Sequence, residues 1–264
     1  MIIIFFILGL IVGSFLNVVV YRLRLMESII GRSYCPHCKN QVRWYDNIPL
    51  LSFVFLRARC RTCKGDISWQ YPVVEFLSGI VFLLVAKFFL EIGNVSSYVE
   101  VFFYLVLFSS LLVLFTYDLK FMEVPIIIFW TTLVIVTTYF LYLGYTDLNN
   151  GVPFFSLNIV SGMIGGFVAW LFFFSLVFFS KETWMGWGDV YIGFLLGFIL
   201  GWPNVFFGLL ISFTVGALYA IIAMIVGEKN MKSQVPFVPF LVLGIIATIF
   251  INEIFPIVKY YFYF

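Results

Sequence analysis

Apolar stretches of about twenty residues recur along almost the whole chain, and they restrict the possible fold more than any other feature. An α-helix of that length spans the hydrocarbon core of a bilayer, where every backbone hydrogen bond must be satisfied within the segment. Charged residues make up only 11% of the 264 residues, whereas they form about a quarter of an ordinary soluble domain. The sequence therefore predicts an all-α polytopic membrane protein.

We expect about eight transmembrane helices, over residues 2–20, 72–92, 98–117, 124–144, 156–179, 189–200, 203–226 and 236–262. Gly201-Trp202-Pro203 separates the short sixth span from the seventh, because proline cannot continue a helix. A count of seven, with 189–226 fused into one helix, is the alternative and would move the C-terminus to the other side. The first apolar run has no basic segment before it and no small-residue cleavage site after it, so we expect a retained helix rather than a signal peptide.

Positive charges are distributed unevenly between the two sides of this predicted bundle. With the N-terminus outside, the cytoplasmic segments are 21–71, 118–123, 180–188 and 227–235, and they carry 13 of the 15 lysines and arginines. Only Lys87 and Lys259 lie near the other face. Because cytoplasmic loops are enriched in cations, this orientation is strongly favoured. We expect three parts: a first helix over 1–20, a cytosolic domain over 21–71 and a membrane core over 72–264.

The polar segment 21–71 contains two CxxC pairs, Cys35 with Cys38 and Cys60 with Cys63, separated by 21 residues. Two such pairs offer four thiolates to one tetrahedral ion, as in a zinc ribbon. Two disulfides are the alternative, but the segment is expected in the reducing cytosol. His37 lies between two better-placed cysteines and is expected to face solvent. The predicted zinc is structural, because four protein ligands leave no position for a water nucleophile.

Two interpretations remain open for the aromatic stretch 44–52 and the basic run 57–61 between the cysteine pairs. They could form an interfacial belt whose arginines face lipid phosphates, or a docking surface for the polar part of a membrane-embedded substrate. Glu75 lies just inside the second span. Its carboxylate could reach the interface along the helix, or it could belong to a buried polar site.

Two aspartates lie at ends of predicted spans on the cytoplasmic side. Asp118 ends the third span, and Asp189 begins the sixth directly after Gly186-Trp187-Gly188. The two glycines permit close backbone approach and a tight turn, so the Asp189 carboxylate can be held outside a regular helix. Either aspartate alone could simply be a helix cap, since a negative charge is favoured at a helix N-terminus.

Several common catalytic arrangements are excluded by what the sequence lacks. The single histidine lies in a cysteine pair, so a Ser-His-Asp or Cys-His site cannot form, and no HExxH, Walker A or glycine-rich dinucleotide motif occurs. An aspartate pair remains. Two neighbouring carboxylates share one proton, so that one activates water while the other polarises a carbonyl, as in aspartic proteases. The alternative is a non-enzymatic transport or assembly protein whose aspartates bind cations or protons.

The chain resembles a known family, the bacterial type IV prepilin peptidases, which belong with the GxGD intramembrane aspartic proteases. The matching stretches are Gly13-Ser14-Phe15-Leu16-Asn17-Val18, Cys35-Pro36-His37-Cys38, Cys60-Arg61-Thr62-Cys63, Tyr71-Pro72-Val73-Val74-Glu75, Asp118-Leu119 with Pro125, Gly186-Trp187-Gly188-Asp189, and Pro236-Phe237 with Pro239-Phe240. They follow one another in the family's order along nearly the whole chain.

The resemblance implies that Asp118 and Asp189 are the catalytic pair, with Gly186 and Gly188 supporting the motif. Such an enzyme cuts the basic leader from a prepilin or pseudopilin at the cytoplasmic membrane face. Members with four cysteines are often bifunctional and methylate the new N-terminus with S-adenosylmethionine; we expect that activity near Glu75 and the cytosolic domain. The expected partners are the prepilin and the lipid bilayer, and no nucleic acid.

Overall fold

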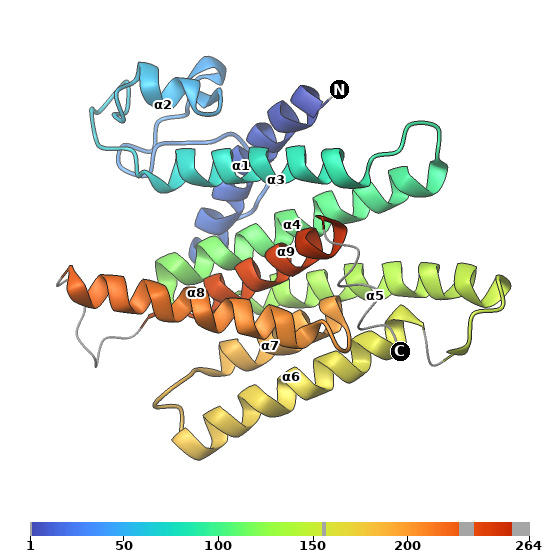
Figure 1. Ribbon diagram of the computed structural model, residues 1–264. Coiled ribbons are helices and arrows are strands. Elements are labelled where there is room, and N and C mark those ends of the chain that lie inside the picture. Colours follow the sequence, from blue (N-terminus) through green and yellow to red (C-terminus); the bar gives the residue numbers. More distant parts are fainter. Residues whose placement is uncertain (1, 155–156, 227–234, 255–264) are drawn as a thin grey trace. The chain divides into compact units, whose positions relative to one another are not determined.

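The computed structural model describes residues 2–154, 157–226 and 235–254, and within them the chain is almost entirely helical (Figure 1). In chain order the elements are α1 (Ile2–Leu25), the 3-10 helix η1 (Trp44–Asn47), α2 (Leu51–Phe55), α3 (Gln70–Phe89), α4 (Val95–Phe121), α5 (Ile126–Asn149), α6 (Asn158–Ser180), α7 (Trp187–Leu200), α8 (Val205–Ile225) and α9 (Val238–Ile254). The extended pairings among the described residues are two isolated bridges, Tyr34 with Gln41 and Arg59 with Asp66. The predicted all-α fold is confirmed.

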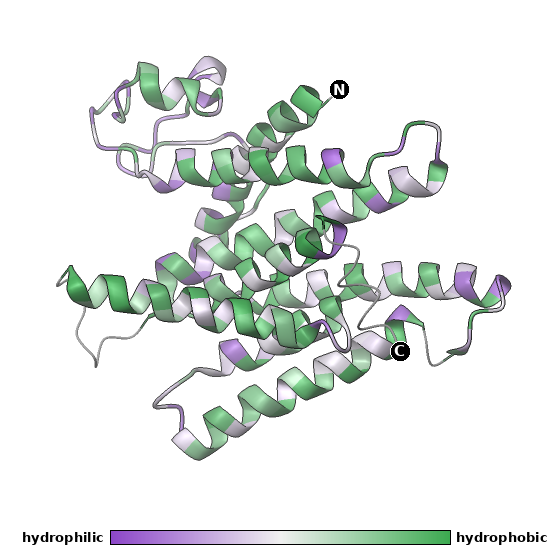
Figure 2. Ribbon diagram, viewed as in Figure 1, coloured by the Kyte–Doolittle hydropathy of each residue, from purple (hydrophilic) through white to green (hydrophobic). Residues whose placement is uncertain are grey.

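Within the described ranges, six helices are long and apolar enough to cross a membrane: α1, α3, α4, α5, α6 and α8. The other two apolar helices, α7 and α9, have 14 and 17 residues in the described part of the chain. Figure 2 shows hydrophobic residues along nearly all of these helices, with the hydrophilic residues gathered mainly at their ends and in the connections. The prediction of a polytopic membrane protein is therefore confirmed.

The break between the predicted sixth and seventh spans is present in the structure. Helix α7 ends at Leu200 and α8 begins at Val205, so the alternative of one fused helix over 189–226 is wrong. The backbone N–H of Trp202, within the break, donates to the carbonyl of Ser161 on α6. The predicted end of the last span at 255–262, Lys259, and residues 227–234 of the last cytoplasmic segment lie outside the described residues.

The chain divides into two compact units, Met1–Thr116 and Tyr117–Phe264. In the first unit, α1 packs closely against α3 because glycines allow the backbones to meet. A Cβ on Gly13 would lie 2.7 Å from the Cα of Glu75, closer than real Cβ contacts allow. Small residues at such crossings are typical of helix pairs in membranes. The Asn17 side chain of α1, only 1% exposed, also joins the two helices by donating a hydrogen bond to the carbonyl of Tyr71 at the start of α3.

In the second unit, α6 and α7 form the closest helix pair, again through glycines. A Cβ on Gly197 of α7 would lie 2.5 Å from the carbonyl carbon of Gly165 on α6. Helices α8 and α9 meet in the same way, with Gly244 against the backbone of Gly208. These contacts fix the direction of α7 and therefore the position of its N-terminus, where Asp189 lies.

Candidate active site and metal site

Asp118 lies in the last turn of α4, at the beginning of the second unit, and is only 5% exposed. The backbone N–H of Val238, the first residue of α9, donates a hydrogen bond to its carboxylate. The oxygen Oδ2 is buried without a hydrogen-bond partner among the described residues. A buried carboxylate oxygen without a partner is rare in folded proteins, and it marks this position as one that calls for an explanation.

Asp189 lies in the first turn of α7 and accepts a hydrogen bond at Oδ2 from the backbone N–H of Gly186, 3.2 Å away. Gly186 is the N-cap residue of α7 and has no side chain, so this bond is the half of a capping box in which the N3 carboxylate accepts from the N-cap backbone. The interpretation of Asp189 as a helix cap therefore explains its hydrogen bond to Gly186. It does not account for the second carboxylate nearby.

Asp118 and Asp189 lie close enough for a direct electrostatic interaction, although 71 positions separate them in the sequence. Among the described residues, no lysine or arginine forms an ion pair with either aspartate. Two like charges in a poorly hydrated place repel each other unless they share a proton or hold a cation. The structure thus brings together the two aspartates that the sequence placed on one face of the membrane.

The two glycines before Asp189 have different surroundings. A Cβ on Gly188 would lie 2.7 Å from Cγ2 of Val124, in the connection between α4 and α5. A Cβ on Gly186 would meet nothing closer than 4.0 Å. Gly188 is therefore needed for close packing against the connection that follows Asp118, whereas the space around Gly186 would admit a side chain.

Glu75 belongs to the first unit, where it is 7% exposed. Its Oε2 accepts a hydrogen bond of 2.8 Å from the backbone N–H of Leu50, and the Ser14 side chain of α1 also bonds to the carboxylate. Leu50 has a φ of 59°, which is unusual for a residue with a side chain, and it precedes α2. Glu75 does not reach along the helix toward water; it anchors the turn before α2 to the start of α3.

The four cysteines form a cluster whose sulfur atoms all lie within 4.8 Å of one another. The Sγ atoms of Cys35 and Cys63, one from each pair, are 3.8 Å apart. Tetrahedral coordination with Zn–S bonds of about 2.3 Å requires sulfur atoms about 3.8 Å apart, so the cluster fits such an ion. None of the four forms a disulfide. These residues could hold a metal ion, as the spacing predicted.

Both cysteine pairs are held by the same backbone arrangement. The N–H of Lys39 donates to the carbonyl of Cys35, and the N–H of Lys64 donates to the carbonyl of Cys60. Lys39 and Lys64 have φ values of 58° and 60°, which turn the chain back to the flanking bridges. His37 is exposed, as expected, with its ring beside Gly65 of the second pair.

An ion pair joins the segment between the cysteine pairs to the second pair. Arg61 donates to both carboxylate oxygens of Asp46, at 2.7 and 2.9 Å, and its guanidinium lies 5.4 Å from the centre of the Tyr45 ring. The hydrogen bonds from Arg61 hold the pKa of Asp46 below its ordinary value. The Asp46 carboxylate is therefore charged at neutral pH, and η1 is tied to the metal site.

Several contributing groups could not be found by inspecting side chains in the sequence. Val238 acts through its backbone N–H, and the only signal for it was the resemblance of the Pro-Phe pairs around it to the family. Leu50 likewise contributes a backbone donor. Arg22, 4% exposed, donates to three backbone carbonyls, those of Ser28, Ile29 and Arg32.

Two family models match the chain. The bacterial peptidase A24 N-terminal domain matches residues 7–89, and the type IV leader peptidase family matches residues 105–221. The first match contains all four cysteines and Glu75, and the second contains both aspartates.

Several curated relatives match over most of their length. The chain is 32% identical to a "type 4 prepilin-like proteins leader peptide-processing enzyme" of Escherichia coli O78:H11, covering 94% of this chain and 93% of the relative. It is 33% identical to a prepilin leader peptidase/N-methyltransferase of Vibrio cholerae, covering 75% and 77%, and 30% identical to one of Pectobacterium carotovorum, covering 90% and 88%. No solved structure matches the chain significantly.

Proposed function

This chain belongs to the type IV leader peptidase family, and from that premise we propose that Asp118 and Asp189 together hydrolyse the bond between the leader and the mature part of a type IV prepilin or pseudopilin. The observation that carries the proposal is the pairing of these carboxylates at the ends of α4 and α7. A non-enzymatic transport or assembly protein is not favoured, because the relatives are named as processing enzymes.

In the proposed reaction, one ionised carboxylate takes a proton from water while the water oxygen attacks the carbonyl carbon of the peptide bond. The other carboxyl, protonated, donates its proton to the carbonyl oxygen. The tetrahedral intermediate then collapses: the C–N bond breaks, the nitrogen takes up the proton that came from water, and the hydroxyl proton returns to the second carboxylate. The leader leaves with a carboxyl terminus, and the pilin gains a free amino terminus.

Hydrogen bonds from the backbone support this proposed division of labour. The N–H of Val238 fixes the Asp118 carboxylate and leaves the buried Oδ2 without a hydrogen-bond partner among the described residues, so this oxygen has a free acceptor position for a water or a substrate that enters the site. The N–H of Gly186 fixes Asp189. Carboxylates held in this way need little reorganisation when the charge develops in the transition state.

We also propose that the chain lies in the inner membrane with its N-terminus outside and both aspartates on the cytoplasmic side. The distribution of lysines and arginines supports this orientation. A prepilin with a basic leader would then present its cleavage site where the aspartates have access to cytosolic water. Its apolar segment would lie in the bilayer parallel to the enzyme's helices.

We propose that the metal is zinc and that its role is structural, because four thiolates complete a tetrahedral shell and leave no open position. The names of the relatives support a second activity, N-methyl transfer to the new amino terminus, for which the donor would be S-adenosylmethionine. The sequence contains no glycine-rich dinucleotide motif that would hold such a nucleoside.

The proposed peptidase is tested with the purified full chain, a prepilin and an isotopically labelled methyl donor, by mass analysis of the product. Asp118→Asn and Asp189→Asn should each lower leader cleavage by about a thousandfold or more, while the protein keeps its metal and its unfolding midpoint. The matched control is Asp147→Asn, in the last turn of α5. This variant should cleave the leader normally. Normal processing by Asp118→Asn or Asp189→Asn would refute the proposal.

A further inference from the structure

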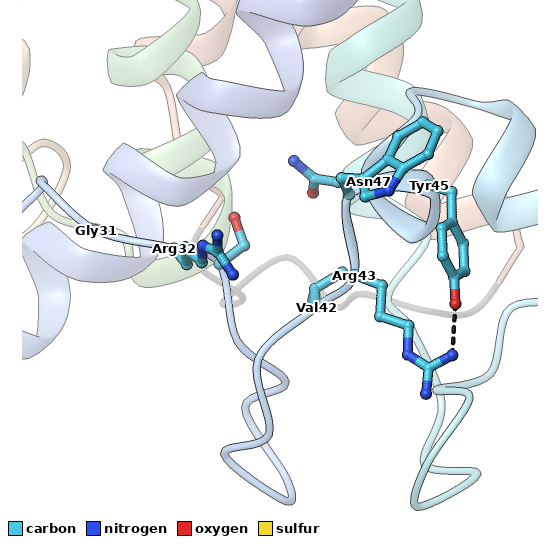
Figure 3. A pocket seen from close by; sticks show the side chains of 8 residues that line it. Gly31, Arg32, Val42, Arg43, Tyr45 and Asn47 are labelled. Atoms are coloured by element: carbon cyan, nitrogen blue, oxygen red, sulfur yellow. Dashed lines mark hydrogen bonds between the residues drawn. The ribbon is translucent and has the colours of Figure 1, made fainter.

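A pocket of about 620 Å³ opens between residues 31–33 and 42–47, in the segment that contains the four cysteines. Figure 3 shows Arg32 on one side of it and Arg43, Tyr45 and Asn47 on the other. Trp44 also lines it. The pocket thus combines two guanidinium groups, two aromatic rings and an amide, and no aspartate or glutamate is among the residues that line it.

The walls of the pocket are fixed by contacts beneath them. The buried guanidinium of Arg22 donates to the carbonyls of Ile29 and Arg32, at 2.8 and 2.9 Å, which holds the first wall. The N–H of Val42 donates to the carbonyl of Ser33 at 2.8 Å, and this bond joins the two walls next to the first cysteine pair. A pocket whose walls are held in place loses little entropy when a ligand binds.

Arg32 and Arg43 have no carboxylate partner within the described residues. Arg43 donates to the hydroxyl of Tyr45, a neutral partner, whereas Asp46 is engaged by Arg61. Two arginines that line one cavity without a carboxylate beside them favour an anion. The arginine fork binds a phosphate with two parallel hydrogen bonds.

The segment that carries the pocket joins α1 to α3, and because both helices are long and apolar enough to cross a membrane, it emerges at one membrane surface. It leaves α1 at Leu25 and enters α3 at Gln70, and the contact between Asn17 and Tyr71 puts both points at the same end of the α1–α3 pair. Next to the pocket, large apolar side chains are exposed, among them Trp44 (81%) and Phe55 of α2 (82%). Aromatic and apolar side chains beside arginines are typical of the zone where lipid headgroups meet hydrocarbon.

From this combination we propose that the pocket binds the phosphate of an anionic phospholipid headgroup between Arg32 and Arg43. In this proposal the exposed apolar side chains of α2 enter the acyl region of the same leaflet. S-adenosylmethionine is disfavoured as the ligand, because its sulfonium and ammonium groups outnumber its one carboxylate and would face two guanidiniums. A basic leader peptide is disfavoured for the same reason. The proposal does not depend on peptidase activity.

The test measures the binding of single lipids to the purified full chain in neutral detergent, by native mass spectrometry with phosphatidylglycerol and phosphatidylcholine. The wild-type chain should bind phosphatidylglycerol more tightly. Replacing both pocket arginines, Arg32→Gln with Arg43→Gln, should weaken that binding about thirtyfold, which is roughly fivefold for each arginine. The control pair with the same charge change outside the pocket, Arg57→Gln with Arg59→Gln, should change it by less than about threefold.

Equal weakening by the two pairs would mean diffuse attraction and would overturn the site. A wild-type chain without preference for phosphatidylglycerol would overturn it as well, and this comparison decides the question even if the pocket variant fails to fold. Folding of each variant is checked by its metal content. Competition separates the sources of the ligand: displacement of the lipid by millimolar inorganic phosphate or by S-adenosylmethionine would assign the pocket to a soluble ligand instead.

Discussion

Gly188 and Val124 are packed so closely that a Cβ on the glycine would lie 2.7 Å from Cγ2 of the valine. We predict that Gly188→Ala lowers leader cleavage about ten- to hundredfold, because the added methyl pushes the first turn of α7, and Asp189 with it, away from its partner. Gly186→Ala should change cleavage less than about twofold, since its Cβ meets open space and its φ of −91° suits alanine. Rates of prepilin processing by the two variants give the comparison.

A rescue experiment separates this explanation from general damage. In the double variant Gly188→Ala with Val124→Ala, the clashing methyl is gone, so most of the lost activity should return. If Gly186→Ala were the more harmful substitution, or if the double variant were as impaired as Gly188→Ala, the packing explanation would be wrong.

Glu75 is predicted to stabilise the turn at Leu50 rather than to take part in chemistry. Glu75→Ala should speed amide exchange at residues 50–55. Losing the charged acceptor costs about 1.5–3 kcal/mol of local stability, and no hydrogen bond to Glu75 then stabilises Leu50 at its φ of 59°. Glu75→Gln keeps an acceptor oxygen and should give an intermediate effect. Hydrogen exchange by mass spectrometry measures both. Unchanged exchange together with complete loss of methyl transfer would point instead to a chemical role for the carboxylate.

Metal removal should affect the two proposed activities differently. Cys35→Ser or a strong chelator should release the metal and make residues 26–69 sensitive to protease, because this segment has few buried apolar side chains to hold it. We expect methyl transfer to fall more than leader cleavage, since the aspartates belong to the other unit of the chain. Metal content, protease digestion and product mass can be followed in one preparation. An equal fall of both activities would contradict this division.

The helices and the cysteine cluster could be predicted because their signals are local. Apolar length alone identifies a membrane span, and the spacing within each CxxC pair identifies a knuckle. The convergence of Asp118 and Asp189 was predicted less directly, from the side of the membrane to which the cations assign each span end. Their roles in catalysis remain predictions.

The contacts that position these residues could not be predicted, because they depend on backbone groups from distant parts of the chain. Val238 reaches Asp118 through an N–H that any residue except proline would supply, so its side chain carries no signal. Of the two open interpretations of Glu75, the structure fits the buried polar site, but its partner there, the N–H of Leu50, is 25 positions away and is a backbone group. Gly186 and Gly188 looked alike in the motif, and only the neighbour Val124 distinguishes them.

The contact between α6 and α7 gives a last prediction, for stability. At Gly197, a Cβ would lie 2.5 Å from the carbonyl carbon and 2.8 Å from the next backbone nitrogen of the facing Gly165-Gly166 pair, and backbone atoms cannot move aside as a side chain can. Gly197→Ala should therefore destabilise the protein by about 1–3 kcal/mol or more, and should reduce cleavage because α7 carries Asp189.

The control for Gly197 is Gly144 on α5, which has nothing within 4 Å of its Cβ position. Gly144→Ala should leave stability unchanged or raise it by up to about 1 kcal/mol, because alanine is the better helix former. Unfolding midpoints in one detergent, at a fixed scan rate, measure the difference between the two variants. If Gly197→Ala unfolded at the same temperature as Gly144→Ala, close backbone packing would not be what holds α7, and the position of Asp189 would need another explanation.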